Sequence, residues 1–340
     1  MKQIKLGAAA LLALLGQYAA SAQTPDPLAP PAPKQMIPQG PTTPREPPSN
    51  EAAGIAVDRY VGDAARSTPH IWRDVIYTRS ILKEGDPDNP PANGAALYYH
   101  KEIAYAEMPA SNATTLAAVP QQVMLYVESG NARLDDGKNF WMLKAHSAVL
   151  IPPNQVHRLV TGDGAPLRMI MLTRILEPEV KPRDGILVRD VDALAMTERN
   201  VHWSNFAKYV FLGADGLYPT DHMYIVYMAP RTIAGAHAHT PGQEEAWVKV
   251  TDGSAVMQLG SEIRPWPINS GFVAPPNGKT VHAAINLSDE TQAWFYISRL
   301  QPTVAPPNPN RPAPPPAIAE GVARATVAGR PLKQAEYGPR

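Results

Sequence analysis

The chain has 340 residues, no cysteine and no net formal charge. This length allows two domains of ordinary size. The absence of cysteine excludes disulfides, thiol chemistry and a lipidated cysteine. The balanced charge gives no electrostatic case for nucleic acid or an anionic membrane as a partner.

The first 22 residues have the pattern of a cleavable signal peptide. Lys2 and Lys5 form a positive start, Leu6 to Ala20 supply an apolar core, and Ala20-Ser21-Ala22 is a small-residue cleavage site. The alternative is a membrane anchor, but the apolar run is short for a spanning helix. We therefore predict cleavage after Ala22 and a periplasmic or secreted protein that makes no membrane contact afterwards.

Proline-rich segments flank the central part of the chain. Residues 23–50 contain frequent prolines, and the same composition returns from Pro302 to Pro316. Proline fixes φ and lacks a backbone donor, so neither segment suits the interior of a helix or sheet. We interpret residues 23–50 as an extended linker and residues 302–340 as a proline-rich tail. The alternative for the linker is a ligand for a proline-binding partner.

The most informative stretch runs from residue 235 to residue 286. His237 and His239 are two positions apart, which places both side chains on one face of a β-strand. A pair of glutamates, Glu244 and Glu245, follows after a short spacer, and His282 comes from a later strand. Three imidazoles and one carboxylate that converge inside a barrel form a divalent-metal site.

Side-chain alternation suggests which glutamate would be the ligand. Residues 244, 246, 248 and 250 read Glu, Ala, Val and Val, which suits a barrel interior, whereas residues 245, 247, 249 and 251 read Glu, Trp, Lys and Thr. We therefore predict Glu244 as the ligand in preference to Glu245. A bulge in the preceding loop would reverse the assignment.

This stretch resembles the two motifs of the cupin superfamily. His237, His239 and Glu244 match the first motif, and His282 with Asn286, which follow Pro275-Pro276, match the second. The resemblance implies a jelly-roll barrel that binds a metal. It implies little about the reaction, because cupins include dioxygenases, decarboxylases, isomerases, lyases and non-catalytic members.

A degenerate copy of the same stretch lies 123 residues earlier. Residues 121–130 align with residues 244–253, and Pro152-Pro153-Asn154 aligns with Pro275-Pro276-Asn277. His157 corresponds to His282, but without gaps the counterparts of the other ligands are Thr114, Leu116 and Gln121. We therefore predict a bicupin whose first barrel is structural and metal-free.

The predicted fold class is all-β, with two tandem jelly-roll barrels and a few short helices. Residues 51–178 form the degenerate N-terminal barrel and residues 179–301 form the C-terminal metal-binding barrel. A short helix is expected near residues 191–198. Cupins commonly form dimers through barrel edges, so the resemblance also allows a homodimer.

The predicted cofactor is one divalent metal ion. Imidazole and carboxylate ligands suit iron, manganese, nickel, cobalt or zinc, and the ligand types do not choose among them. His222, Tyr224 and Tyr296 are candidates for catalysis because they occupy strands that could line the cavity; the alternative for the aromatic residues is core packing.

Three functions fit this sequence. The first is a metal-dependent enzyme, either a dioxygenase or a lyase or isomerase, that acts on a small organic acid, sugar or phenol. The second is non-catalytic binding of a small molecule through the metal. The third is a structural bicupin. The complete ligand set favours an enzyme, because a purely structural barrel could lose those residues as the first copy has done.

Overall fold

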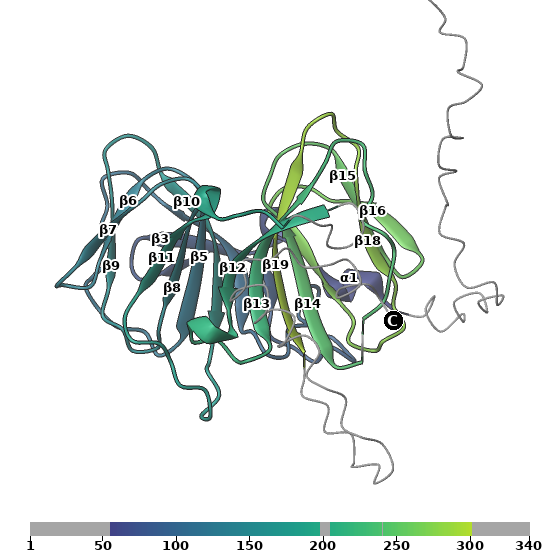
Figure 1. Cartoon of the computed structure of the whole chain (residues 1–340), viewed down its shortest axis with the longest axis horizontal. Helices are drawn as coiled ribbons and strands as arrows, with labels where there is room; N and C mark the ends of the chain where they lie inside the picture. The colour runs from purple at the N-terminus through teal and green to yellow at the C-terminus, as the bar shows by residue number, and fades with distance from the viewer. Residues whose placement is uncertain (1–54, 198–204, 240, 301–340) are drawn as a thin grey trace, which may run out of the picture. The chain divides into compact units, whose positions relative to one another are not determined.

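The computed structural model describes residues 55–197, 205–239 and 241–300. The predicted signal peptide, linker and proline-rich tail lie outside these residues. The described residues form two neighbouring β-barrels, as predicted, and the helices among them are single turns (Figure 1). None of these helices has the length and hydropathy needed to cross a membrane.

The first barrel combines a seven-stranded antiparallel sheet with a three-stranded sheet. The large sheet has the order β11-β8-β5-β10-β4-β3-β2, and the small one has the order β7-β6-β9. Their bounds are β2 (His70–Trp72), β3 (Ile76–Lys83), β4 (Glu102–Met108), β5 (Gln122–Ser129), β6 (Ala132–Asp135), β7 (Phe140–Leu143), β8 (Ser147–Ile151), β9 (Arg158–Thr161), β10 (Leu167–Arg174) and β11 (Leu187–Asp190).

The second barrel repeats this plan with a six-stranded and a three-stranded sheet. The orders are β1-β17-β14-β19-β13-β12 and β16-β15-β18. Their bounds are β1 (Val61–Asp63), β12 (Asn205–Leu212), β13 (Asp221–Met228), β14 (Gln243–Lys249), β15 (Ala255–Leu259), β16 (Glu262–Pro265), β17 (Ser270–Ala274), β18 (His282–Asn286) and β19 (Gln292–Leu300).

The helical turns lie at the edges of these sheets. They are α1 (Val57–Tyr60) and the 3₁₀ turns η2 (Ala64–Arg66), η3 (Val191–Ala193) and η4 (Gly213–Asp215). The helix expected near residues 191–198 is therefore a single 3₁₀ turn, which the Asp190 side chain caps by accepting a hydrogen bond from the backbone of Asp192. The last residue of that expected helix lies outside the described residues.

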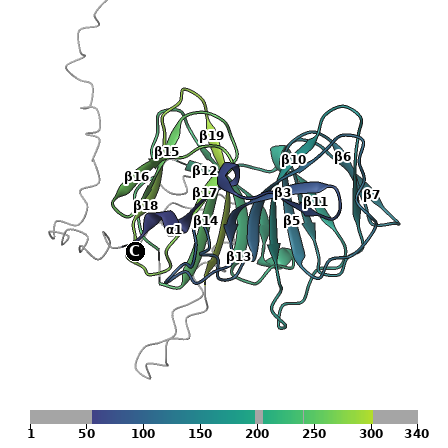
Figure 2. The same ribbon diagram turned by 180° about the vertical axis from the view of Figure 1, so that it is seen from behind.

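Each barrel receives one edge strand from outside its predicted sequence range. β1 pairs with β17 of the second barrel through Gly62 and Gly271, and β11 pairs with β8 of the first barrel through Val188 and Val149. Figure 2 shows β17 in the second barrel and β11 in the first. The predicted boundary at residues 178 and 179 therefore does not separate the two large sheets. The exchanged strands cover sheet edges that would otherwise be open to pairing. A side chain at Gly62 would collide with the carbonyl oxygen of Ile81 on β3.

Both faces of the central strands β5 and β14 of the large sheets are buried over most of their length. Val123, Leu125 and Val127 on β5 point into the first barrel. The opposite face, with Met124 and Tyr126, joins a hydrophobic cluster shared with the second barrel. The outer faces of the barrels are thus part of the core, where each fully buried aliphatic side chain contributes about 1.5–3 kcal/mol.

Buried ion pairs also connect the two barrels. Arg174 at the end of β10 pairs with Asp221 at the start of β13, and its Nη2 lies 2.8 Å from Glu177 Oε2. Arg299 on β19 also pairs with Glu177, and its guanidinium lies 4.0 Å from the ring centre of Tyr99. Because the charged groups are largely removed from water, loss of one partner would leave an uncompensated buried charge.

Candidate metal centre

The three predicted histidine ligands meet in the second barrel. His237 and His282 exchange backbone hydrogen bonds of 3.2 and 2.9 Å, which fixes the segment before β14 against the start of β18. His239 follows two residues after His237 on the same segment. One nitrogen from each of the three rings lies within 4.8 Å of the others. They form a cluster that could hold a metal ion.

The carboxylate that joins this cluster belongs to Glu245. This fully buried side chain is ion-paired with Nε2 of His239, and its Oε1 lies 3.6 Å from Nε2 of His282. Trp247 Nε1 donates a 2.5 Å hydrogen bond to Glu245 Oε1, and the Tyr296 hydroxyl also hydrogen-bonds to the carboxylate. Two aromatic donors therefore hold the carboxylate facing the imidazoles.

The prediction of Glu244 as the ligand is wrong. Its side chain lies on the opposite face of β14, where Oε1 is 2.5 Å from Nδ1 of His100. Its other carboxylate oxygen accepts hydrogen bonds from the backbone amides of Tyr98 and Tyr99, the latter at 2.9 Å. Glu244 thus joins the second barrel to the segment before β4 and does not face the histidines.

The error has a physical cause in the packing of β14. All seven residues of this strand are buried, so the face that carries Ala246 and Val248 needs apolar residues just as an interior does. Trp247 and Lys249, predicted to face outward, are instead 0% and 1% exposed. When neighbours cover both faces, alternation of polarity no longer distinguishes inside from outside.

The sequence alignment of the two copies at a shift of 123 residues is also wrong by one residue where β5 is matched to β14. Val123 pairs with Ile151 in the first barrel, and Glu245 pairs with Ala274 in the second. Ala274 lies 123 positions after Ile151, but Glu245 lies only 122 positions after Val123. The additional residue of the second copy lies in the turn between Lys249 and Gly253. A shift of one residue moves every side chain of a strand to the other face.

The protonation state of the cluster suits a metal ligand set. Burial and the neighbouring His282 lower the pKa of His237 to about 4, and burial also lowers the pKa of His282. Burial raises the pKa of Glu245, but His239 and His282 outweigh this effect and hold the pKa well below its ordinary value. At neutral pH, His237 and His282 are therefore uncharged and the carboxylate is ionised, as metal ligands must be.

The orientation of the His237 ring also suits metal binding. His237 Nδ1 is 2.7 Å from the carbonyl oxygen of Gly235, so this nitrogen carries the proton and Nε2 keeps its lone pair. A metal bound about 2.0–2.1 Å from each nitrogen needs only short side-chain movements from the present spacing. The residues therefore fit a single divalent ion.

The three candidate catalytic residues lie beside this cluster on the inner face of the same sheet. The register aligns His222 with Ser298 and Ser298 with Glu245, which puts His222 level with the carboxylate. The His222 ring stacks on Tyr224 at 4.7 Å, and Tyr224 stacks on Tyr296 at 5.4 Å. Burial lowers the pKa of His222 to about 4.

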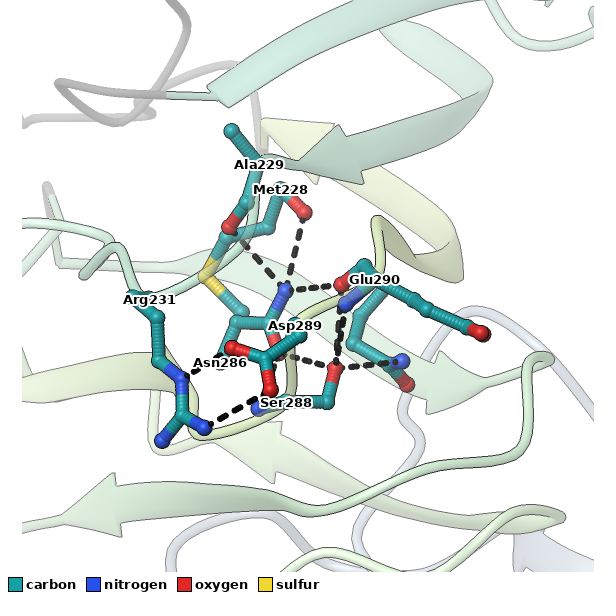
Figure 3. Close-up of polar contacts among 8 residues, drawn as sticks. Met228, Ala229, Arg231, Asn286, Ser288, Asp289 and Glu290 are labelled. Atoms are coloured by element: carbon teal, nitrogen blue, oxygen red, sulfur yellow. Dashed lines mark hydrogen bonds and ion pairs between the residues drawn. The ribbon is translucent and has the colours of Figure 1, made fainter. Parts of the chain in front are cut away.

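Asn286, which belongs to the second motif, connects the ends of two strands by hydrogen bonds. Its amide nitrogen donates to the carbonyl oxygens of Met228, Ala229 and Glu290 at 3.2, 3.0 and 2.7 Å (Figure 3). Its amide oxygen accepts hydrogen bonds from the backbone and hydroxyl of Ser288. Asn286 therefore fastens the end of β18, which begins with His282, to the end of β13.

The first barrel replaces the metal ligands with a different arrangement. Ala117 pairs with His157 as His237 pairs with His282, so Ala117, rather than Thr114, is the counterpart of His237. By the same register Val119, rather than Leu116, is the counterpart of His239.

An arginine occupies the position facing the surviving histidine. The Arg73 guanidinium hydrogen-bonds to Nε2 of His157 and donates to the carbonyl oxygens of His157 and Thr115 at 2.8 and 2.5 Å. His157 Nδ1 is 2.8 Å from the carbonyl oxygen of Gln155. Both ring nitrogens of His157 are thus engaged by other groups of the chain.

Two tandem jelly-roll barrels, one of which holds a three-histidine cluster, define the bicupin arrangement of the cupin fold. No family model matches this sequence, and no curated protein matches it. Solved structures of the same fold do match it. AerE from Microcystis aeruginosa is 14% identical with a TM-score of 0.54, and the match covers 72% of this chain and all of AerE.

Two further structures show the same likeness. Protein Ylba from E. coli is 12% identical, with a TM-score of 0.53 and coverage of 70% of this chain and 89% of Ylba. Oxalate decarboxylase from Lactobacillus farciminis, solved as a formate complex, is 12% identical, with a TM-score of 0.51 and coverage of 71% of this chain and 86% of the enzyme. At these identities the likeness establishes the fold.

Proposed function

We propose that the protein is a metal-dependent enzyme that acts on a small organic acid. One divalent ion would be held in the second barrel by His237, His239, His282 and Glu245. The observation that carries this proposal is the convergence of three imidazole nitrogens within 4.8 Å beside a fully buried carboxylate. Without an ion, this arrangement would bury a negative charge and several polar rings at considerable cost.

The charge of the site points to the class of substrate. Uncharged imidazoles and one carboxylate leave a divalent ion with net positive charge, which attracts an anionic oxygen group. The bound ion would supply Lewis-acid or redox chemistry at its open positions. The formate complex of the similarly folded oxalate decarboxylase supports a small carboxylate as the substrate class.

The chain's own residues would then position the ligands and transfer protons. Tyr296 and Trp247 hold the Glu245 carboxylate through their hydrogen bonds. His222 is half-buried and, with a pKa of about 4, uncharged at neutral pH, so it can accept a proton. Tyr224, which stacks against the His222 ring, would fix its orientation.

The proposed setting is the periplasm or the extracellular space. It rests on the signal-peptide pattern of residues 1–22, with the mature protein beginning at Gln23. A homodimer remains part of the proposal on the cupin resemblance alone.

Turnover assays on the metal-loaded mature protein test the proposal. A panel of small mono- and dicarboxylic acids would be incubated with the protein while oxygen consumption and carbon dioxide release are followed separately. We expect turnover that disappears in the His237→Ala/His239→Ala variant. His222→Gln should keep the metal but lower kcat at least about 100-fold, the usual contribution of a general acid or base. Tight binding of these acids without turnover would contradict the enzymatic role and leave a metal-dependent binding protein.

A further inference from the structure

A cavity lies on the face of β14 opposite the metal centre. Its volume is about 290 Å³, and it opens between the segment before β4 and the loops of the second barrel. The residues that give it its chemistry are Pro87, Asp88, Tyr98, Tyr99, Glu244 and Pro276.

The walls of this cavity combine rings with negative charge. Tyr98 is 62% exposed, and Pro87 and Pro276 add rigid apolar surface beside it. Aromatic grooves of this kind bind proline-rich segments, whose polyproline conformation is already ordered and costs little entropy to fix. Asp88, which is exposed, places a carboxylate at this cavity, which favours a segment that also carries a cation.

The chain itself supplies such a segment next to the cavity. β19 ends at Leu300, which pairs with Gln243, and the neighbouring Gly242 lines the cavity. The sequence continues with the proline-rich residues 302–316, which include Arg311. Residues 301–340 contain five basic and two acidic side chains, so this tail is complementary in charge to the Asp88 carboxylate.

We propose that this cavity is the docking site of the chain's own proline-rich tail, residues 302–316, with Arg311 directed to Asp88. The eleven residues from Leu300 to Arg311 reach up to about 34 Å in a polyproline helix, which is ample for a site that begins beside Gln243. This inference is independent of the metal and of turnover, because it concerns the other face of β14.

Disulfide trapping tests the docking directly, because the chain contains no cysteine of its own. Cysteines would be placed at Asn89, which is exposed beside Asp88, and at Ala313 in the tail (Asn89→Cys/Ala313→Cys). Mild oxidation of the full mature protein should form an intramolecular disulfide, detected by peptide mass spectrometry.

A matched control pairs Ala313→Cys with Ser254→Cys. Ser254 is also exposed, but it lies beyond the other end of β14, about 24 Å from Gly242 at the rise of a strand. The tail can reach both positions, so we expect the Asn89 pair to form at least about ten times faster than the Ser254 pair. Adding Tyr98→Ala or Arg311→Ala to the Asn89 pair should slow trapping severalfold.

Three results would overturn the proposal. Equal trapping rates at Asn89 and Ser254 would mean that the tail samples the surface without docking. Disulfides found only between two chains would assign the cavity to the tail of a second copy. Faster trapping of Asn89→Cys by Ala32→Cys than by Ala313→Cys would assign it to the N-terminal linker. Unfolding curves of each variant, compared with the parent, would confirm that all of them are folded.

Discussion

The two barrels share one fold but differ at the positions that would hold a metal. Val123 in the first barrel occupies the strand position of Glu245 in the second, and Ala117 occupies that of His237. Apolar side chains at these positions pack the first barrel without any ion. The comparison shows that the second barrel buries a carboxylate and a histidine cluster where the first has apolar residues, and burying such groups is costly unless they are paired.

The histidine that both copies retain has different neighbours in the two barrels. His282 faces the carboxylate of Glu245 and two other imidazoles, whereas His157 faces the guanidinium of Arg73. The first barrel therefore places a cationic side chain of the chain against its histidine, whereas the second places a carboxylate and two further imidazoles there, a cluster that could hold a metal ion. One motif position thus belongs to a hydrogen-bonded structural contact in one copy and to the candidate metal cluster in the other.

The largest effect is expected from the two adjacent glutamates. Glu245→Gln removes a charged ligand and should weaken metal binding at least about 100-fold. Glu244→Gln is the matched control, because it lies on the opposite face of the strand and should change metal affinity less than about threefold. Isothermal titration with the metal measures both. Equal losses in the two variants would contradict the assignment of Glu245.

Arg73→Met tests whether the arginine takes the place of an ion in the first barrel. The substitution removes a charged donor that hydrogen-bonds to the His157 ring and to backbone carbonyl oxygens, so we expect a loss of about 1.5–3 kcal/mol in the free energy of unfolding. Arg168→Met, which removes an exposed ion pair with Glu107 in the same barrel, should cost less than about 1 kcal/mol. Urea unfolding compares them, and similar losses would refute a special role for Arg73.

The buried His157 predicts a dependence of stability on pH. Burial lowers its pKa to about 4, below the ordinary value of 6.5, so the folded state favours the neutral ring. The stabilisation is complete above pH 6.5 and is lost as the pH falls towards 4, by at most about 3 kcal/mol. Unfolding at pH 7.5 and 4.5 should therefore show a smaller pH-dependent loss in His157→Gln than in the parent. An identical loss in both proteins would show that this histidine is not responsible.

The smallest effect is expected from Trp247→Phe. This change keeps most of the ring but removes the donor to Glu245, so metal affinity should fall about tenfold, as for other groups that orient a ligand. Leu125 at the equivalent position of the first barrel has no such function, and Leu125→Val should leave metal affinity unchanged. An unchanged affinity in Trp247→Phe would mean that the carboxylate needs no indole donor.

The sequence predicts the fold because its signals are local and repeated. Strand alternation, turn residues and two Pro-Pro-Asn segments indicate two barrels, and the structure has them. The exchanged strands β1 and β11 are not predictable in this way, because short strands can pair with any open edge nearby. The partner of an edge strand depends on the packing of the whole chain.

The site was only partly predictable. The three histidines are brought together as their spacing indicates. Alternation favours Glu244 over Glu245, because residues of the first barrel help to cover the outer face of β14 and so hide the contrast between its two faces. The contact between Arg73 and His157 could not be predicted from the sequence, since Arg73 lies in a turn more than 80 residues before His157.

The metal content of the mature protein, from Gln23 onward, tests the central claim most directly. Mass spectrometry on the parent and on the His237→Ala/His239→Ala variant would give the number of ions per chain. Our account predicts about one equivalent in the parent and none in the variant, with the first barrel still folded. Two equivalents in the parent, or full occupancy in the variant, would contradict a single site in the second barrel.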